Sequence, residues 1–179
     1  GGGGSASAGG GCVKIQAGTL ELAGAIRADG GPRPGNVSGG GAGGSIRIAA
    51  GMLSGSGSMS ACGGAGYGSC GGGGGGRIAI FYQTLDAVAL TNNLAASGGT
   101  GGANGSAGTI YTRQTGERGT VRIENRAVVS AAGTPLWRPD GTNDFETLTV
   151  RGTNLVVELP TGIVNAASIL VTDGAKLVH

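Results

Sequence analysis

Residues 39–64 read GGGAGGSIRIAAGMLSGSGSMSACGG, a stretch that combines two patterns seldom found together. Runs of glycine are typical of flexible linkers. The alternation of Ile46 and Ile48 with polar or small residues is instead typical of a strand with one buried face. The fold therefore depends on whether the glycines separate the structured elements or belong to them.

The composition of the whole chain argues against simple disorder. Of 179 residues, 43 are glycine and 5 are proline. Charged residues make up only 12%, whereas chains that stay unfolded are usually polar and highly charged. A formal net charge of +2, with no dense Lys/Arg cluster, predicts no nucleic-acid partner. The sequence contains no apolar run long enough to predict a transmembrane segment. Because it begins with Gly1 and not with methionine, we expect part of a longer or processed protein.

Two stretches align at an offset of 33 residues without a gap, namely residues 12–31 and residues 45–64. Aliphatic residues meet aliphatic residues and glycine meets glycine in this alignment, as in Val13 with Ile46, Ile15 with Ile48, Leu20 with Leu53, and Gly18 with Gly51. A third copy in residues 77–99 follows at an offset of 32 and is extended by three residues near its end. An internal repeat of this length predicts a layered architecture in which each copy stacks on the one before.

A six-residue rhythm recurs inside each copy, as in VKIQAG, TLELAG and AIRADG over residues 13–30. Alternate residues are aliphatic and the sixth is glycine, which indicates a short strand closed by a bend. Three such strands predict three sides of one coil, and stacked coils align the aliphatic residues into ladders. The sequence therefore predicts an all-β chain folded as a parallel β-helix, or β-solenoid.

The glycine-rich runs between these strand triplets admit two interpretations. As linkers they would be the most flexible parts of the chain. They recur in register with the strands, however, so we favour segments that also stack, extended or polyproline-II-like, with backbones in close approach.

Glycine is concentrated in the first part of the chain, with 36 of 43 in residues 1–108. We therefore expect glycine-rich repeats over residues 1–108 and a continuation with shorter coils over residues 109–179. In the second part Leu148 and Val150 recur as Ile169 and Val171 at an offset of 21. A coil of that length favours a right-handed helix; the alternative is a left-handed hexapeptide β-helix, whose turn fits the 18-residue strand triplets.

The pattern GG-x-I-x-I-x-A-G-x-L-x-G-x-G in residues 43–57, together with GGGGGGRIAI and AGTIY, resembles glycine-rich β-helical regions of large secreted or surface-displayed bacterial proteins. The resemblance covers most of the chain. It implies an extracellular or cell-surface shaft, stalk or adhesive segment, and it carries no catalytic motif.

The sequence contains few groups of residues that could act in catalysis or bind a metal. The only histidine is His179 at the terminus, so neither a nucleophile triad nor a zinc site can be assembled locally. Cofactor and metal sites are therefore not predicted. The one grouping of carboxylates lies in WRPDGTNDFE, with the candidate glycan contacts Trp137, Arg138, Asp140 and Asp144, and with Glu146 nearby. We interpret it mainly as a Pro- and Asp-rich turn, and alternatively as the acid/base pair of a polysaccharide-degrading β-helix enzyme.

The three cysteines lead to two expectations. Cys62 and Cys70 enclose seven residues of one glycine-rich loop, and a disulfide between them would close that loop in an oxidising compartment. The alternative is two reduced thiols. Cys12 has no obvious partner within the chain, so it is a candidate for a bond between molecules.

These observations favour one function over two alternatives. We expect an extracellular structural protein, a subunit or segment of a filament or stalk that associates with itself head to tail because neither end looks capped. The alternatives are an adhesin module that binds a surface glycan and the carbohydrate-active enzyme; ice binding lacks support because only Thr147 and Thr149 form a T-x-T pair.

Overall fold

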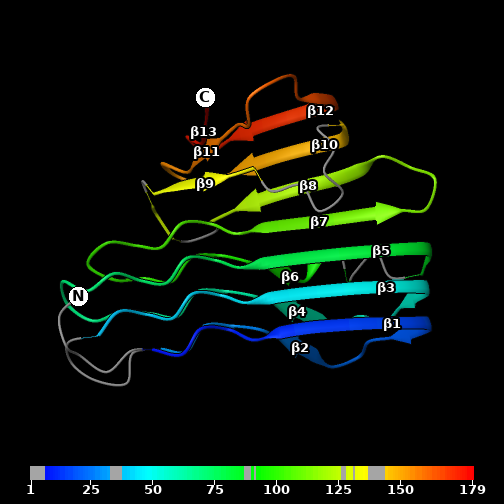
Figure 1. The fold of residues 1–179 in the computed structure, drawn as a ribbon, viewed down its shortest axis with the longest axis horizontal. Coiled ribbons are helices and arrows are strands. Elements are labelled where there is room, and N and C mark those ends of the chain that lie inside the picture. Colours follow the sequence, from blue (N-terminus) through cyan, green and yellow to red (C-terminus); the bar gives the residue numbers. More distant parts are fainter. Residues whose placement is uncertain are drawn as a thin grey trace.

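A computed structural model of the chain describes residues 7–32, 38–86, 90, 92–125, 128–130, 132–136 and 144–179. The described part is built from β-strands arranged in three sheets (Figure 1). Seven strands form the main sheet: β1 (Cys12–Glu21), β3 (Ser45–Ser54), β5 (Arg77–Asp86), β7 (Thr109–Gln114), β8 (Gly119–Glu124), β10 (Asp144–Arg151) and β12 (Asn165–Thr172). The two smaller sheets are β2 (Ala25–Arg27), β4 (Ser58–Ser60) and β6 (Leu94–Ala95), and β9 (Gly133–Pro135), β11 (Val156–Glu158) and β13 (Lys176–Val178).

Strand pairing follows the repeat seen in the sequence. β1 pairs with β3 in parallel, with Val13 opposite Ile46 and Leu20 opposite Leu53, so the register equals the predicted offset of 33. β3 pairs with β5 at the predicted offset of 32. β10 pairs with β12 at an offset of 21, which places Leu148 opposite Ile169. The sequence prediction of an all-β chain with aligned aliphatic ladders is confirmed for these pairs.

The six-residue units do not form three separate strands. The first unit and the first half of the second lie within the single strand β1, which ends at Glu21, and the third unit begins with a strand of its own, β2. Inside β1 the more buried side chains are Val13, Ile15, Ala17 and then Leu20, so the alternation shifts by one residue at Gly18. No positive φ is recorded at Gly18, and the extended backbone therefore continues through it.

The main sheet carries a different core on each of its two faces. Alternate residues of a strand point to opposite faces, and the neighbours Ile110 and Tyr111 belong to two different clusters of buried side chains. Ile110 packs with Ile46, Ile78 and other residues of the first repeats, in the core covered by β2, β4 and β6. Tyr111 packs with a second set covered by β9, β11 and β13: Val121, Ile123, Phe145, Leu148, Val150 and Val157.

The strand direction reverses between β7 and β8, where the core also changes from one face of the main sheet to the other. β7 and β8 form the one antiparallel pair of the main sheet, whereas the other described pairs of that sheet are parallel. A rotation by half a turn about the axis along which the strands stack reverses the strand direction and also moves the core to the opposite face of the sheet. The second part of the chain is therefore the same kind of layer as the first, rotated by half a turn.

The first and second parts of the chain differ mainly in the length of the connection that leads from a short strand to the next strand of the main sheet. Between β2 and β3 the chain makes a long excursion over residues 28–44, of which the structure describes 28–32 and 38–44, whereas between β11 and β12 it needs only residues 159–164. This excursion accounts for most of the difference between the offsets of 33 and 21. Three such excursions project side by side from one end of the strands (Figure 1). Among the described residues, no helix is long and apolar enough to cross a membrane.

Candidate functional site

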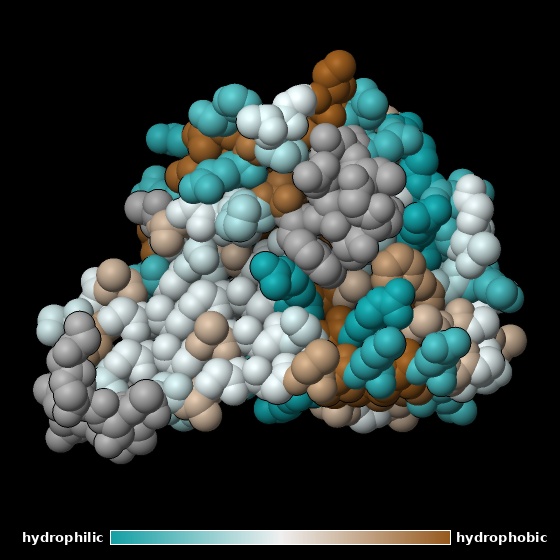
Figure 2. Space-filling model, in the orientation of Figure 1, coloured by the Kyte–Doolittle hydropathy of each residue, from teal (hydrophilic) through white to brown (hydrophobic). Residues whose placement is uncertain are grey.

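The glycine-rich excursions lie together as one ordered body, which we call the glycine arm. It consists of three outgoing segments, residues 28–32, 61–66 and 96–101, and four returning segments, residues 7–11, 38–44, 71–76 and 103–108. Each returning segment leads directly into a long strand of the main sheet: β1, β3, β5 or β7. The arm forms the pale surface at the lower left of Figure 2, with few hydrophilic or hydrophobic side chains.

Backbone hydrogen bonds join every layer of the arm to the next. One series crosses back and forth between outgoing and returning segments through glycine N–H donors, with N···O distances of 2.7–3.0 Å: Gly31 to Ala8, Gly41 to Gly31, Gly64 to Gly41, Gly73 to Gly64, Gly99 to Gly73, and Gly105 to Gly99. Glycine amides thus provide the lateral bonding that strand pairing provides in a sheet.

The direction of these donors repeats every three residues. Gly40 and Gly43 donate to the next returning segment, at Gly71 and Gly74, whereas Gly41 donates to an outgoing segment, at Gly31. A threefold repeat of donor direction is also found in polyproline II. These bonds confirm the prediction that the glycine runs stack, for the segments that the structure describes.

Close backbone contact explains why these positions are glycine. A Cβ atom added at Gly73 would lie 1.9 Å from the carbonyl oxygen of Gly41, and one added at Gly64 would lie 2.0 Å from that of Gly31. Real Cβ atoms do not approach backbone that closely, so any side chain at these positions would push two layers apart.

Polar side chains cap the last layer of the arm, where the glycine layers end. Asn125 is fully buried; its Oδ1 accepts the N–H of Gly98 at 2.9 Å, and its Nδ2 donates to the carbonyl of Gly105 at 3.3 Å. Ser130 Oγ donates to the carbonyl of Asn104 at 3.0 Å, and Thr134 Oγ1 donates to that of Ala107 at 2.8 Å. These side chains replace the bonds that a further glycine layer would make.

The repeat pattern did not predict this cap of the arm, whereas the expectation that neither end of the chain is capped concerns the outer edges and stays a prediction. A signal was present in Asn125, Ser130 and Thr134, because such side chains can pair with backbone groups. At the opposite edge, Asp29 accepts hydrogen bonds from Ser60 Oγ and from the N–H of Cys62, at 2.8 and 2.7 Å.

The predicted disulfide between Cys62 and Cys70 is not formed, and all three cysteines carry thiols in this structure. Cys62 lies near the base of the arm and Cys70 at its tip, where Gly66 faces the backbone of Cys70. Gly66 lies four residues after Cys62 along the extended segment, which corresponds to about 12 Å at 3.1 Å per residue. A disulfide requires Cα atoms within about 7 Å, so an extended arm keeps these thiols apart. Cys12 is exposed on β1 at the edge of the main sheet, and its bond between molecules stays a prediction.

The carboxylate group predicted as a turn or an enzyme site is described only in part. Trp137, Arg138 and Asp140 lie outside the described residues. Asp144 and Glu146 are exposed at the start of β10, and Asp144 forms an ion pair with Arg118. Asp173 accepts a hydrogen bond from Arg151 Nε at 2.7 Å, which raises the pKa of Arg151. Within the part of the chain that the structure describes, no group of three or more His, Cys, Asp or Glu residues could hold a metal ion.

A hollow of about 300 Å³ lies where the arm meets the main sheet. It is lined by glycine backbone, by Arg77, and by the hydroxyl-bearing residues Ser45, Ser106, Thr109 and Thr134. No protein-family model, curated protein or solved structure matches this chain.

Proposed function

We propose that this chain is a structural segment of an extracellular or cell-surface stalk or filament, built as a β-solenoid that lengthens by adding layers. The observation that carries the proposal is the glycine pattern at the edge formed by β1 and β2. Gly11, Gly18 and Gly24 are glycines although a Cβ atom at any of them would meet nothing within 4 Å.

In the next layer, formed by β3 and β4, the glycines at the corresponding positions lie close to the backbone of the first layer. A Cβ atom at Gly44 would lie 2.0 Å from the carbonyl oxygen of Gly11, one at Gly51 would lie 2.6 Å from that of Gly18, and one at Gly57 would lie 2.4 Å from that of Gly24. The edge glycines therefore keep free the space that the carbonyl groups of a further layer would occupy. Nothing within the described chain requires that space.

The partner that fits this edge is another glycine-rich layer with an arm of its own. Such a layer would pair with β1, with β2 and with the arm segments at residues 7–11 and 28–32. The opposite edge, β12 and β13, lacks an arm because its coil has the short connection at residues 159–164. Between the two routes to head-to-tail growth, addition of further repeats is thus favoured over a homopolymer of identical copies.

The edge at β12 is also open. Its inward residues Ile169 and Val171 remain 49% and 39% exposed, whereas Leu148 and Val150 in the preceding strand are fully buried. An unpaired strand with exposed aliphatic residues is a template for another strand. Both edges thus have the properties of interior layers of a longer stack. The placement at the cell exterior rests on the family resemblance of the glycine pattern.

Duplication of one layer tests this proposal. A second copy of residues 12–44 inserted directly before Cys12 preserves the register and moves the original Gly18 from the edge into the interior. We expect the inserted amides to be protected from exchange, with the body longer by one strand spacing, about 4.8 Å. Gly18→Ala should leave the melting temperature of the parent chain within about 1–2 °C and lower that of the extended chain by roughly 5 °C or more. An equal effect in both chains, or unprotected inserted amides, would refute the stacking of layers.

A further inference from the structure

The outer face of β1, β3 and β5 carries a row of cations whose residues lie far apart in the sequence. Lys14 and Arg47 lie directly opposite each other on neighbouring strands, and Arg77 follows on the third strand, opposite Ser45. All three residues are exposed. The first halves of the four strands that share this face, residues 12–17, 45–50, 77–82 and 109–114, contain no carboxylate.

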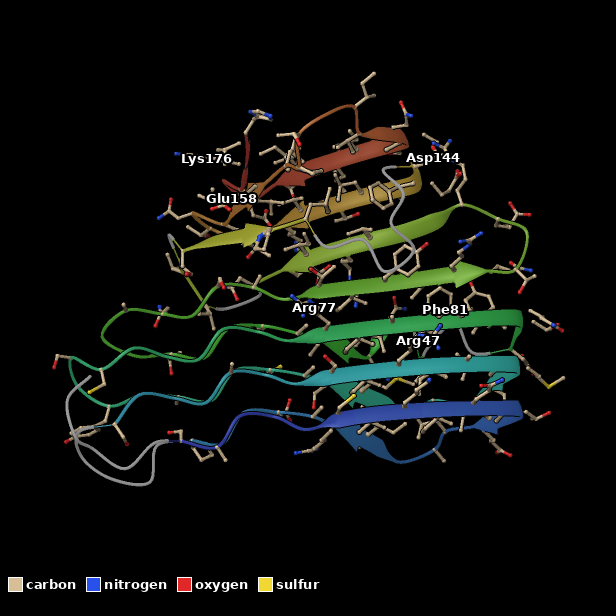
Figure 3. All side chains as sticks on the ribbon, viewed as in Figure 1. Arg47, Arg77, Phe81, Asp144, Glu158 and Lys176 are labelled. Carbon is tan, nitrogen blue, oxygen red and sulfur yellow. The ribbon has the colours of Figure 1, made fainter. Side chains whose placement is uncertain are left out.

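The pairing of Lys14 with Arg47 places two cations side by side. Like charges directly opposite each other on paired strands repel, and this repulsion destabilises a sheet. The guanidinium of Arg47 lies 4.9 Å from the ring centre of Phe81, a cation–π contact that holds it in place (Figure 3). A fixed cation beside a second cation is an arrangement that an anion would stabilise.

The hollow of about 300 Å³ adjoins this row. Arg77 and Ser45 line it, together with Ser106 and Thr109. Hydroxyl and guanidinium groups beside glycine backbone offer hydrogen bonds to a small polar group. The volume is at the lower end of ligand sites, about 300–1,000 Å³, and suits a single sugar ring.

We propose that this face binds an acidic polysaccharide whose chain crosses the strands over Lys14, Arg47 and Arg77, with one sugar ring in the hollow. Neighbouring strands are about 4.8 Å apart, which is close to the length of one pyranose unit in an extended polysaccharide. Successive uronate carboxylates can therefore meet successive strands. Arginine pairs with carboxylates through two parallel hydrogen bonds, which adds orientation to the charge attraction.

The site shares no residue with the group predicted at Trp137, Arg138, Asp140 and Asp144. It also adds to the structural proposal without depending on it. A stack of layers can exist with any charge on this face, and the face can bind a glycan whether or not further layers are present.

Binding of oligogalacturonate to the full chain, measured by calorimetry at low salt, tests the proposal. A neutral galactan oligomer of equal length and single-stranded DNA serve as the other probes. We expect oligogalacturonate alone to bind well. Lys14→Gln combined with Arg47→Gln should weaken binding about tenfold or more. Arg27→Gln combined with Lys176→Gln removes the same charges from other surfaces and should change binding by about twofold at most.

Melting temperatures separate loss of binding from loss of folding. Removing Lys14 and Arg47 relieves a repulsion and also removes the contact of Arg47 with Phe81, two effects of opposite sign, so the melting temperature of that double variant should stay within about 2 °C of the parent value. Equal binding of neutral galactan, tighter binding of DNA, an equal loss in the control variant, or no binding of oligogalacturonate would each overturn the proposal.

Discussion

At the scale of single residues, glycine has two different roles in one run. Within residues 71–76, Gly73 lies against the backbone of Gly41, and an added Cβ atom would be 1.9 Å from its carbonyl oxygen. At Gly71, two positions earlier, the nearest atom to such a Cβ would be 3.5 Å away, an ordinary contact. Composition alone cannot distinguish the two glycines, because the difference comes from a segment about 30 residues away.

Alanine substitutions at these two positions should therefore differ sharply. Gly73→Ala forces two layers of the arm apart and should lower the free energy of unfolding by roughly 3 kcal/mol or more. Gly71→Ala should change it by less than about 1 kcal/mol. Denaturant melts of the two variants beside the parent chain measure the difference. Equal stability of the two variants would mean that the run behaves as a linker.

At the scale of elements, the arm is bounded by a cap whose main residue is Asn125. This side chain satisfies one donor and one acceptor of the last glycine layer, and it is fully buried. The cap explains how a stack of glycine layers can end inside a folded chain without leaving buried backbone groups unpaired.

Asn125→Ala should destabilise the protein because it removes the cap of the arm. With the Gly98 amide and the Gly105 carbonyl left unpaired, the free energy of unfolding should fall by roughly 2 kcal/mol or more. The amide of Gly98 should also exchange faster with solvent. Asn165→Ala, at an exposed position of β12, is the matched control and should have little effect. Unchanged exchange at Gly98 would show that Asn125 does not form the cap.

The sequence predicted the registers of β1 with β3, of β3 with β5 and of β10 with β12, because aliphatic residues recur at constant offsets in these pairs. It did not predict the reversal of the core, although a signal was present. Ile80, Phe81 and Tyr82 are three consecutive large apolar residues, a pattern typical of a strand covered on both faces. The row of Lys14 and Arg47 could also have been read from the same alignment. The position of Asn125 relative to Gly98 depends on the path of the chain after β8, which no repeat specifies.

At the scale of the whole molecule, two sets of layers share one main sheet and differ by half a turn. The glycine arm belongs to the first set, and its segments are bonded to one another as regularly as the strands are. The arm is thus part of the folded body, and the proposals for stacking and for glycan binding both depend on its being rigid.

Hydrogen exchange at the glycine amides of the arm measures that rigidity most directly. The amides of Gly41, Gly64, Gly73 and Gly99 donate to other segments of the arm at 2.8–3.0 Å. Resolved by NMR, they should exchange as slowly as the amides in the centre of β3, because both groups open only when layers separate. If these glycines exchange at the rate of an unstructured chain while β3 stays protected, the arm is a set of flexible linkers and the account is contradicted.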